Sequence, residues 1–180
     1  PMGSSANIEG RIAAQNICGA KISYKGVLGT AVAKLPELNV GRTGLNENDA
    51  RAAGFDAVTV LCVADDKASY YPDFGSFIIK LVADKTTRRF LGLQVLGKGA
   101  VDKVVDIGVM ALSMNAKISD MEDLDFAYAP PFSTAIHPLS TAINVMKNKL
   151  SGHMDSMTPA QYEDGEADGY DIKIGRASCR

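Results

Sequence analysis

Residues 77–96, which read FIIKLVADKTTRRFLGLQVL, decide the fold of this chain. Two runs rich in aliphatic residues, 77–83 and 90–96, flank the short polar connection 85–89. A third run of the same kind, 55–63, precedes them. Apolar runs of this length, bounded by polar residues, are typical of β-strands, and short connections imply that neighbouring strands are antiparallel. We therefore predict an antiparallel sheet.

Apolar residues at helical spacing predict several helices around this sheet. They cover residues 8–18, 101–115 and 139–150, with a short helix over 50–53 that has Asn46 as its polar cap. Ser119 and Glu122 have the spacing of a capping box and predict that a further helix begins there. Pro36 interrupts an extended run and predicts an edge strand or a break. Together these patterns indicate an α+β domain with an antiparallel sheet and helices packed on one face.

The composition argues against several classes of function. A chain of 180 residues, 46% of them hydrophobic, can bury one ordinary core. Its 19 basic and 21 acidic side chains give no excess of positive charge of the kind that binds nucleic acid. The apolar runs are far shorter than the roughly 20 residues that cross a bilayer, and no signal peptide pattern opens the sequence. We expect a cytoplasmic protein that has neither nucleic acid nor a membrane as a partner.

The cysteines do not form a recognisable redox or metal centre. Cys18, Cys62 and Cys179 are widely spaced, so neither a zinc site nor a dithiol pair is predicted, and we expect no metal. Cys62 lies in a β-branched run and is expected to be a core thiol. Cys18 follows a helix, whose C-terminal end disfavours a thiolate. Neither cysteine is a good candidate for a nucleophile.

Residues 97–102 (GKGAVD) follow a strand and open a helix, which is the context that a dinucleotide-binding fingerprint requires. Asp102, however, takes the place of the third glycine, and its carboxylate would repel a pyrophosphate. A plain strand-to-helix turn with an acidic first turn is the favoured interpretation, and we assign no nucleotide to it.

Residues 128–138 (YAPPFSTAIHP), which we name the lip, lie between two helical patterns. Its prolines fix their own φ and push the preceding residues out of the helical region, so we expect an extended segment that presents side chains. His137 could act as a general acid or base, but no carboxylate follows it within one helical turn. A helix-start residue without a catalytic role is favoured. Tyr70 and Tyr128 both precede prolines and could equally be ordinary hydrogen-bonded tyrosines.

Five ordered segments resemble the C-terminal dimerisation domain of the FAD-dependent pyridine nucleotide-disulfide oxidoreductases, in the branch of the coenzyme A-disulfide reductases and NADH oxidases. The segments are SANIEGR (5–11), YKGVLGT (24–30), TGLNE (43–47), VLGKGAVDK (95–103) and YAPPFS (128–133). The resemblance extends from residue 1 to about residue 152. In that family the turn near residue 97 is structural, which agrees with the interpretation above.

The resemblance implies that FAD and NAD(P)H bind in two domains absent from this sequence, together with the redox cysteine. The lip of one subunit would cover the flavin and substrate pocket of its partner in a homodimer. Tyr128, Pro130 and Phe132 would then contact FAD, while Tyr70 and Tyr128 would assist at a small-molecule disulfide or persulfide. The resemblance also favours His137 as a third catalytic residue, a proton donor. The acidic residue that usually orients such a histidine in the family is replaced here by Ala142. Asn7 would line the substrate cleft.

The resemblance also suggests a division of the chain. Residues 1–26 would end the FAD domain, 27–152 would form the dimerisation domain, 153–172 a linker or the truncated start of a rhodanese-like domain, and 173–180 a non-native tail. At 136–138 the sequence has Ile-His-Pro, where the coenzyme A branch usually has Lys-Asp-Pro. An NADH oxidase or peroxidase of the same branch remains an alternative, as does a stand-alone dimerisation module. We expect the chain by itself to be inactive.

Overall fold

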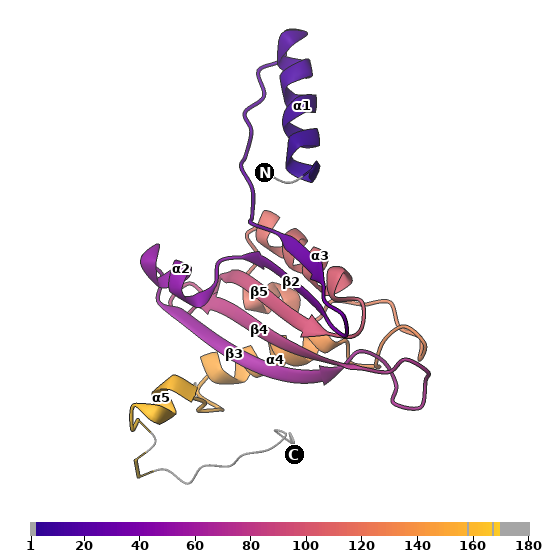
Figure 1. Cartoon of the computed structure of the whole chain (residues 1–180). Helices are drawn as coiled ribbons and strands as arrows, with labels where there is room; N and C mark the ends of the chain where they lie inside the picture. Colours follow the sequence, from indigo (N-terminus) through magenta and orange to yellow (C-terminus); the bar gives the residue numbers. More distant parts are fainter. Residues whose placement is uncertain (1–2, 158, 167, 170–180) are drawn as a thin grey trace.

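The computed structural model describes residues 3–157, 159–166 and 168–169. The strands form one antiparallel sheet in the order β1-β2-β5-β4-β3. In chain order the elements are α1 (Gly3–Ile17), β1 (Ala31–Lys34), β2 (Asn39–Gly44), α2 (Glu47–Ala52), β3 (Ala57–Asp65), β4 (Ser76–Asp84), β5 (Phe90–Gly97), α3 (Val101–Ser113), the 3₁₀ turn η1 (Ile118–Met121), α4 (Pro138–Leu150) and α5 (Pro159–Glu163). Figure 1 shows the sheet with α3 and α4 behind it.

The three strands predicted from the aliphatic runs are β3, β4 and β5, and they pair as consecutive antiparallel neighbours. Pro36 lies between β1 and β2, where the amide of Leu35 donates to the carbonyl of Leu38 over 2.7 Å. The predicted break at this proline is therefore the turn of a hairpin. β1 and β3 are the edge strands of the sheet.

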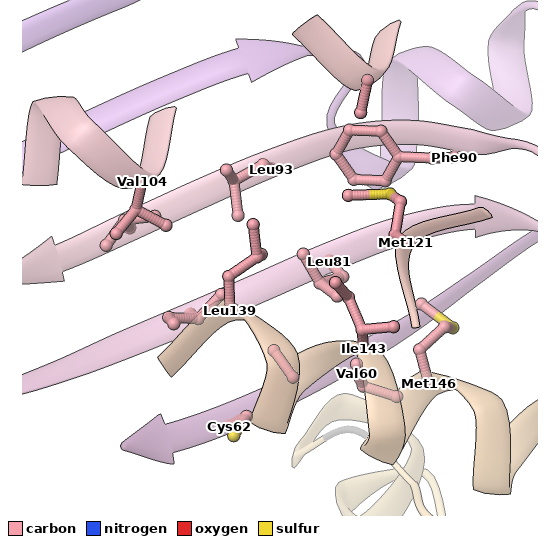
Figure 2. Packing of buried hydrophobic residues seen from close by; sticks show 14 of the residues in the cluster. Val60, Cys62, Leu81, Phe90, Leu93, Val104, Met121, Leu139, Ile143 and Met146 are labelled. Carbon is pink, nitrogen blue, oxygen red and sulfur yellow. The ribbon is translucent and has the colours of Figure 1, made fainter. Parts of the chain in front are cut away.

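The main core lies between the sheet and the helices α3 and α4, as the amphipathic patterns predicted. Side chains of alternate strand residues meet side chains of both helices there. Figure 2 shows Leu81, Leu93 and Leu139 converging between the strands and α4. A smaller cluster, formed by Ala50, Val82 and Leu91, lies where the short helix α2 covers one end of the opposite face. The predicted α+β class is confirmed.

The helix predicted to begin at Ser119 is a local prediction that is wrong. Residues 118–121 form a single 3₁₀ turn, and Ser119 lies inside it. The amide of Lys117 donates instead to the carboxylate of Asp120 over 2.8 Å. Ser119 and Glu122 have the spacing of a capping box, but a neighbouring carboxylate caps the turn. At α2, by contrast, the Asn46 side chain accepts from the amide of Asp49 as predicted.

The two ends of the described chain extend away from the sheet. α1 has no buried residue and is joined to β1 by an extended segment, and Figure 1 shows it apart from the sheet. The predicted domain boundaries at 26 and 152 stay predictions. The predicted tail, 173–180, lies outside the described residues. Among the helices described, none has the length and apolar character needed to cross a membrane.

Candidate functional site

A pocket of about 200 Å³ opens between the start of α3, the loop from β3 to β4, and the lip. Three segments that are far apart in the sequence therefore meet at one place. The pocket is lined by Asp66, Lys67, Phe77, Gly99, Ala100, Lys103, Val104, Pro131, Phe132, Ser133, His137 and Pro138. Asp66 and Lys67 belong to the loop that carries Tyr70, and Pro131 belongs to the lip, which carries Tyr128. Both segments that the sequence singled out for a tyrosine near a proline therefore border the pocket.

Asp66 closes the neck of the first segment, residues 66–75, which we name the tyrosine loop. The backbone amide of Asp66 donates to the carbonyl of Gly75 over 2.9 Å, and the amide of Gly75 donates to Oδ1 of Asp66 over 2.8 Å. Asp66 is buried. Tyr70, at the far side of this loop, is 77% exposed, and its ring packs against Tyr71 with the centroids 5.1 Å apart. The clasp at Asp66 thus presents Tyr70 to solvent on a closed loop.

Gly99 fits between this clasp and α3 because it has no side chain. A Cβ at this position would lie 2.5 Å from Oδ2 of Asp66 and 2.9 Å from the ring of Phe77. β5 ends at Gly97 and α3 begins at Val101, so the predicted strand-to-helix turn is confirmed. Ala100, at the N-cap, offers no side-chain hydrogen bond to the helix. The start of α3 therefore reaches the pocket with its backbone uncapped by a side chain.

The lip was predicted to be extended, but it is a turn, because the φ that proline fixes also suits the inner positions of a turn. Its aromatic side chains are exposed. The carbonyl of Ala129 accepts from the amides of Phe132 and Ser133, over 2.8 and 3.1 Å. This pair of hydrogen bonds encloses Pro130 and Pro131. Phe132 is 76% exposed and Tyr128 is 55% exposed, whereas Ser133 is buried. The lip therefore turns an aromatic surface outward and a small polar side chain inward.

His137 is buried at the N-cap of α4, where its side chain replaces the usual polar cap. Its Nδ1 accepts from the amide of Leu139 over 3.2 Å, and its ring stacks on Phe126 with the centroids 4.4 Å apart. Burial, together with the positive charge of Lys103, lowers the pKa of His137 to about 4. Because Nδ1 accepts a hydrogen bond, the neutral ring carries its proton on Nε2. Among the described residues, no carboxylate hydrogen-bonds this imidazole.

Asn7 lies on α1, away from the pocket. Its side-chain amide donates to the carbonyl of Gly3 over 2.8 Å, within the same helix. Figure 1 shows α1 well separated from the lip and the tyrosine loop. The structure thus brings together the segments that carry Tyr70, Tyr128 and His137, but it does not bring Asn7 to them.

The family described as the pyridine nucleotide-disulphide oxidoreductase dimerisation domain matches residues 30–140, more than half of the chain. The chain belongs to this family. Its dimerisation domain has the antiparallel sheet and flanking helices that the sequence predicted, and the match includes the tyrosine loop and the lip.

Curated relatives agree with this assignment. The chain is 35% identical over 147 residues to the CoA-dependent NAD(P)H sulfur oxidoreductase of Pyrococcus furiosus, covering 82% of the chain and 33% of that protein. It is 30% identical over 139 residues to the coenzyme A disulfide reductase of Staphylococcus epidermidis, covering 77% of the chain and 31% of that protein. The NADH oxidase of Methanocaldococcus jannaschii is 30% identical over 151 residues, which cover 84% of the chain and 34% of that protein. The chain thus spans about a third of the length of these relatives.

Solved structures share the fold. The reduced CoADR-RHD of Bacillus anthracis superposes with a TM-score of 0.87 at 35% identity, covering 94% of the chain and 30% of that structure. The NAD-dependent persulfide reductase of A. fulgidus superposes with a TM-score of 0.85 at 35% identity, covering 89% of the chain and 30% of that structure. The order of strands and helices in this dimerisation domain is therefore that of a known oxidoreductase domain.

Neither Cys18 nor Cys62 lines the pocket. Cys62 lies in the core beneath α4 (Figure 2), and burial raises the pKa of its thiol. Cys18 is exposed and unpaired, and Cys179 lies outside the described residues. No group of acidic, histidine or cysteine side chains suited to a metal occurs in the part of the chain that the structure describes.

Sequence reasoning missed three residues that build the pocket: Asp66, Lys103 and Ser133. Each acts through a contact with a distant segment, so no local spacing marks it. Asp66 bonds across nine residues to Gly75, and Lys103 meets the lip only after α3 has packed on the sheet.

Proposed function

We propose that this dimerisation domain belongs to an FAD-dependent NAD(P)H oxidoreductase that reduces a disulfide or persulfide, such as coenzyme A disulfide. The domain would join two identical subunits and complete the active site of the partner with its lip. The exposed aromatic surface of the lip, Tyr128 with Phe132, carries the proposal. Relatives named as sulfur oxidoreductases and coenzyme A disulfide reductases support it. The free thiols at Cys18 and Cys62 suit a reducing compartment such as the cytoplasm.

The lip has the character needed to contact a flat aromatic cofactor. Phe132 and Tyr128 expose most of their ring surface on a segment stiffened by Pro130 and Pro131. Contiguous apolar patches on a protein surface often mark an interaction site. FAD, held by domains outside this chain, would supply the transfer of electrons from NAD(P)H to the disulfide. Tyr128, Pro130 and Phe132 would cover it and exclude water.

The two exposed tyrosines are the proposed proton donors. Cleavage of a disulfide or persulfide leaves a thiolate, which a phenol can stabilise by donating a hydrogen bond or a proton. Tyr128 on the lip and Tyr70 on the tyrosine loop are exposed from the two segments that flank the pocket. His137 plays a different part, because a pKa of about 4 keeps it neutral near pH 7. It would fix the lip to α4 and donate only through Nε2.

Phenylalanine substitutions in the full-length protein test these assignments. Tyr128→Phe should lower kcat for disulfide reduction by about 10²–10⁴-fold, and Tyr70→Phe should also lower it. Tyr162→Phe is a matched control, because Tyr162 is comparably exposed at 57% but lies on α5. Unchanged turnover of disulfide, persulfide, peroxide and oxygen by Tyr128→Phe would remove the catalytic role from the lip.

A second candidate is an NADH oxidase or peroxidase, favoured by the M. jannaschii relative of that name. It would use the same lip but accept oxygen or peroxide in place of a disulfide. Parallel assays of NAD(P)H consumption with coenzyme A disulfide, persulfide, peroxide and oxygen separate the two candidates. The position of Asn7, kept as a proposed substrate contact, is tested by Asn7→Ala, which should raise KM with little change in kcat if Asn7 lines the cleft.

A further inference from the structure

Ser133 presents an unusual polar group in the pocket. The residue is 2% exposed, and its hydroxyl has no hydrogen-bond partner. Buried polar groups in proteins are normally paired, so an orphaned one points to a ligand or another missing partner. Ser133 lines the pocket, and a rotation of its side chain that turned the hydroxyl towards a bound group would supply this hydrogen bond.

The start of α3 supplies further donors at the same place. α3 is 13 residues long, and its N-cap, Ala100, provides no side-chain acceptor. The amide of Val101 bonds to the carbonyl of Gly99, but the next amides of a first turn have no helical acceptor. These amides and the helix dipole favour an anion. Asp102, in the same first turn, is exposed and is not among the pocket residues, so solvent screens its repulsion of an anion and its carboxylate does not fill this position.

The charges in the pocket leave one cation in excess. Its titratable groups are Asp66, Lys67, Lys103 and His137. Oδ1 of Asp66 accepts from Gly75, while Oδ2 lies 4.0 Å from Nζ of Lys67, so these two charges offset each other. Lys103 has no ion pair within the described residues. His137 is neutral near pH 7. The pocket therefore combines a net positive charge with unsatisfied donors.

We propose that this pocket binds a phosphate group, either inorganic phosphate or the phosphate of a monoester, through Lys103, Ser133 and the first amides of α3. Its volume of about 200 Å³ is below the ~300–1,000 Å³ of sites that enclose whole ligands, and so suits a single small group. The site lies entirely within this chain. It can therefore be tested without the oxidoreductase activity, and it stands or falls separately from the proposed function.

The two histidines of the chain make a direct test possible. NMR titration of the 180-residue chain resolves His137 in the pocket from His153, which is exposed beyond α4. Bound phosphate should offset the charge of Lys103 and raise the pKa of His137 from about 4 by about one unit. The amides of Lys103 and Ser133 should shift as well, while His153 should respond only as it does to sodium chloride at matched ionic strength.

Two variants and a matched control locate the binding. Lys103→Met keeps the aliphatic stem but removes the charge, and it should weaken phosphate binding by about tenfold or more. Lys98→Met alters an exposed lysine of the same turn that does not line the pocket, and it should change binding little. Ser133→Ala removes a hydroxyl without a partner, so it should weaken binding without lowering the free energy of unfolding.

Three probes distinguish the sources of the phosphate. Tighter binding of 4′-phosphopantetheine than of inorganic phosphate, with no binding of pantetheine, would identify a monoester ligand. Equal or tighter binding of inorganic phosphate would identify the free ion, and either result supports the site. The proposal is overturned if millimolar phosphate leaves His137 and the amides of Lys103 and Ser133 unmoved. It is also overturned if Lys98→Met weakens binding as much as Lys103→Met does.

Discussion

The core beneath α4 and the lip beside it use apolar side chains in opposite ways. Leu81, Leu93 and Ile143 are fully enclosed between the sheet and the helices, whereas Phe132 and Ile136 of the lip lie largely in solvent. The two regions are adjacent in the chain, because α4 begins where the lip ends. The core is therefore enclosed by this chain alone, while the lip leaves apolar side chains that the described residues do not cover.

Buried polar groups in the two regions also differ in whether this chain supplies their hydrogen-bond partners. Asp84, at the end of β4, is buried and accepts hydrogen bonds from the amides of Asp56 and Thr87 and from the hydroxyl of Thr87. Ser133, in the lip, is buried with none. Among the described residues, the buried side-chain atom without a hydrogen-bond partner therefore lies at the pocket and not in the sheet. Substitutions in the two regions should separate folding from binding.

The largest effect is expected from Ile143→Ala in the core. Truncating a fully buried aliphatic side chain should lower the free energy of unfolding by about 2–5 kcal/mol, because burial is lost and a cavity remains. Urea denaturation of the chain measures this loss. Met110→Ala, on the exposed side of α3, is the control and should stay within about 0.5 kcal/mol. Similar losses for both variants would contradict a core confined to the inner face of the helices.

The difference between core and lip also explains how much could be predicted from sequence. Periodicity located β3, β4, β5, α3 and α4, because each buries one continuous apolar face and the pattern records that burial. The prolines nearby drew attention to Tyr70, Tyr128 and His137, but only the family resemblance implied catalytic roles for them. Periodicity could not find the Asp66 clasp, or that Lys103 and Ser133 line one pocket, because both depend on how distant segments pack. The Ser119 prediction failed for a similar reason, since several nearby polar residues can cap one turn and Asp120 does so.

At the boundary between the two regions, His137 should make stability depend on pH. Its folded pKa, about 4, lies below the ordinary value of 6.5, so the unfolded chain takes up the proton first as the pH falls. The contribution of the neutral His137 to the free energy of unfolding is complete above pH 6.5 and is lost as the pH falls towards 4. At about 1.4 kcal/mol per pKa unit, the loss between pH 7 and about pH 4.5 is on the order of 2–3 kcal/mol.

Denaturation curves at pH 7 and near pH 4.5 measure this dependence. His137→Asn keeps a side-chain acceptor at the N-cap of α4 but removes the titration, so the difference between it and the native chain should change with pH. His153→Asn removes the exposed histidine and should leave the dependence intact. If His137→Asn behaves like His153→Asn across this range, then His137 is accessible to protons in the folded chain and the lip is looser than the structure indicates.

A smaller effect, with its own pH window, is expected at Asp84. Hydrogen bonds from the side chain and backbone of Thr87 and from the backbone of Asp56 lower the pKa of this carboxyl. Its contribution is therefore present above the unfolded pKa of about 3.9 and is lost as the pH falls through the lower folded value. Asp84→Asn should cost about 1–3 kcal/mol at pH 7, because one acceptor becomes a donor facing donors. The difference in the free energy of unfolding between this variant and the native chain should become smaller near pH 3. A difference that stays the same at all pH values would mean that the variant loses packing and not a charged acceptor.

The smallest effect on folding, and the sharpest contrast with the core, is expected for Phe132→Ala. The ring is already in solvent, so the free energy of unfolding should change by less than about 0.5 kcal/mol. Phe126→Ala is the matched control, because that ring is partly buried against the core and stacks on His137, and its loss should be clearly larger. In the full-length protein, Phe132→Ala should instead weaken turnover or self-association. A Phe132 variant as destabilised as the Phe126 variant would mean that the lip packs on this chain rather than on a partner.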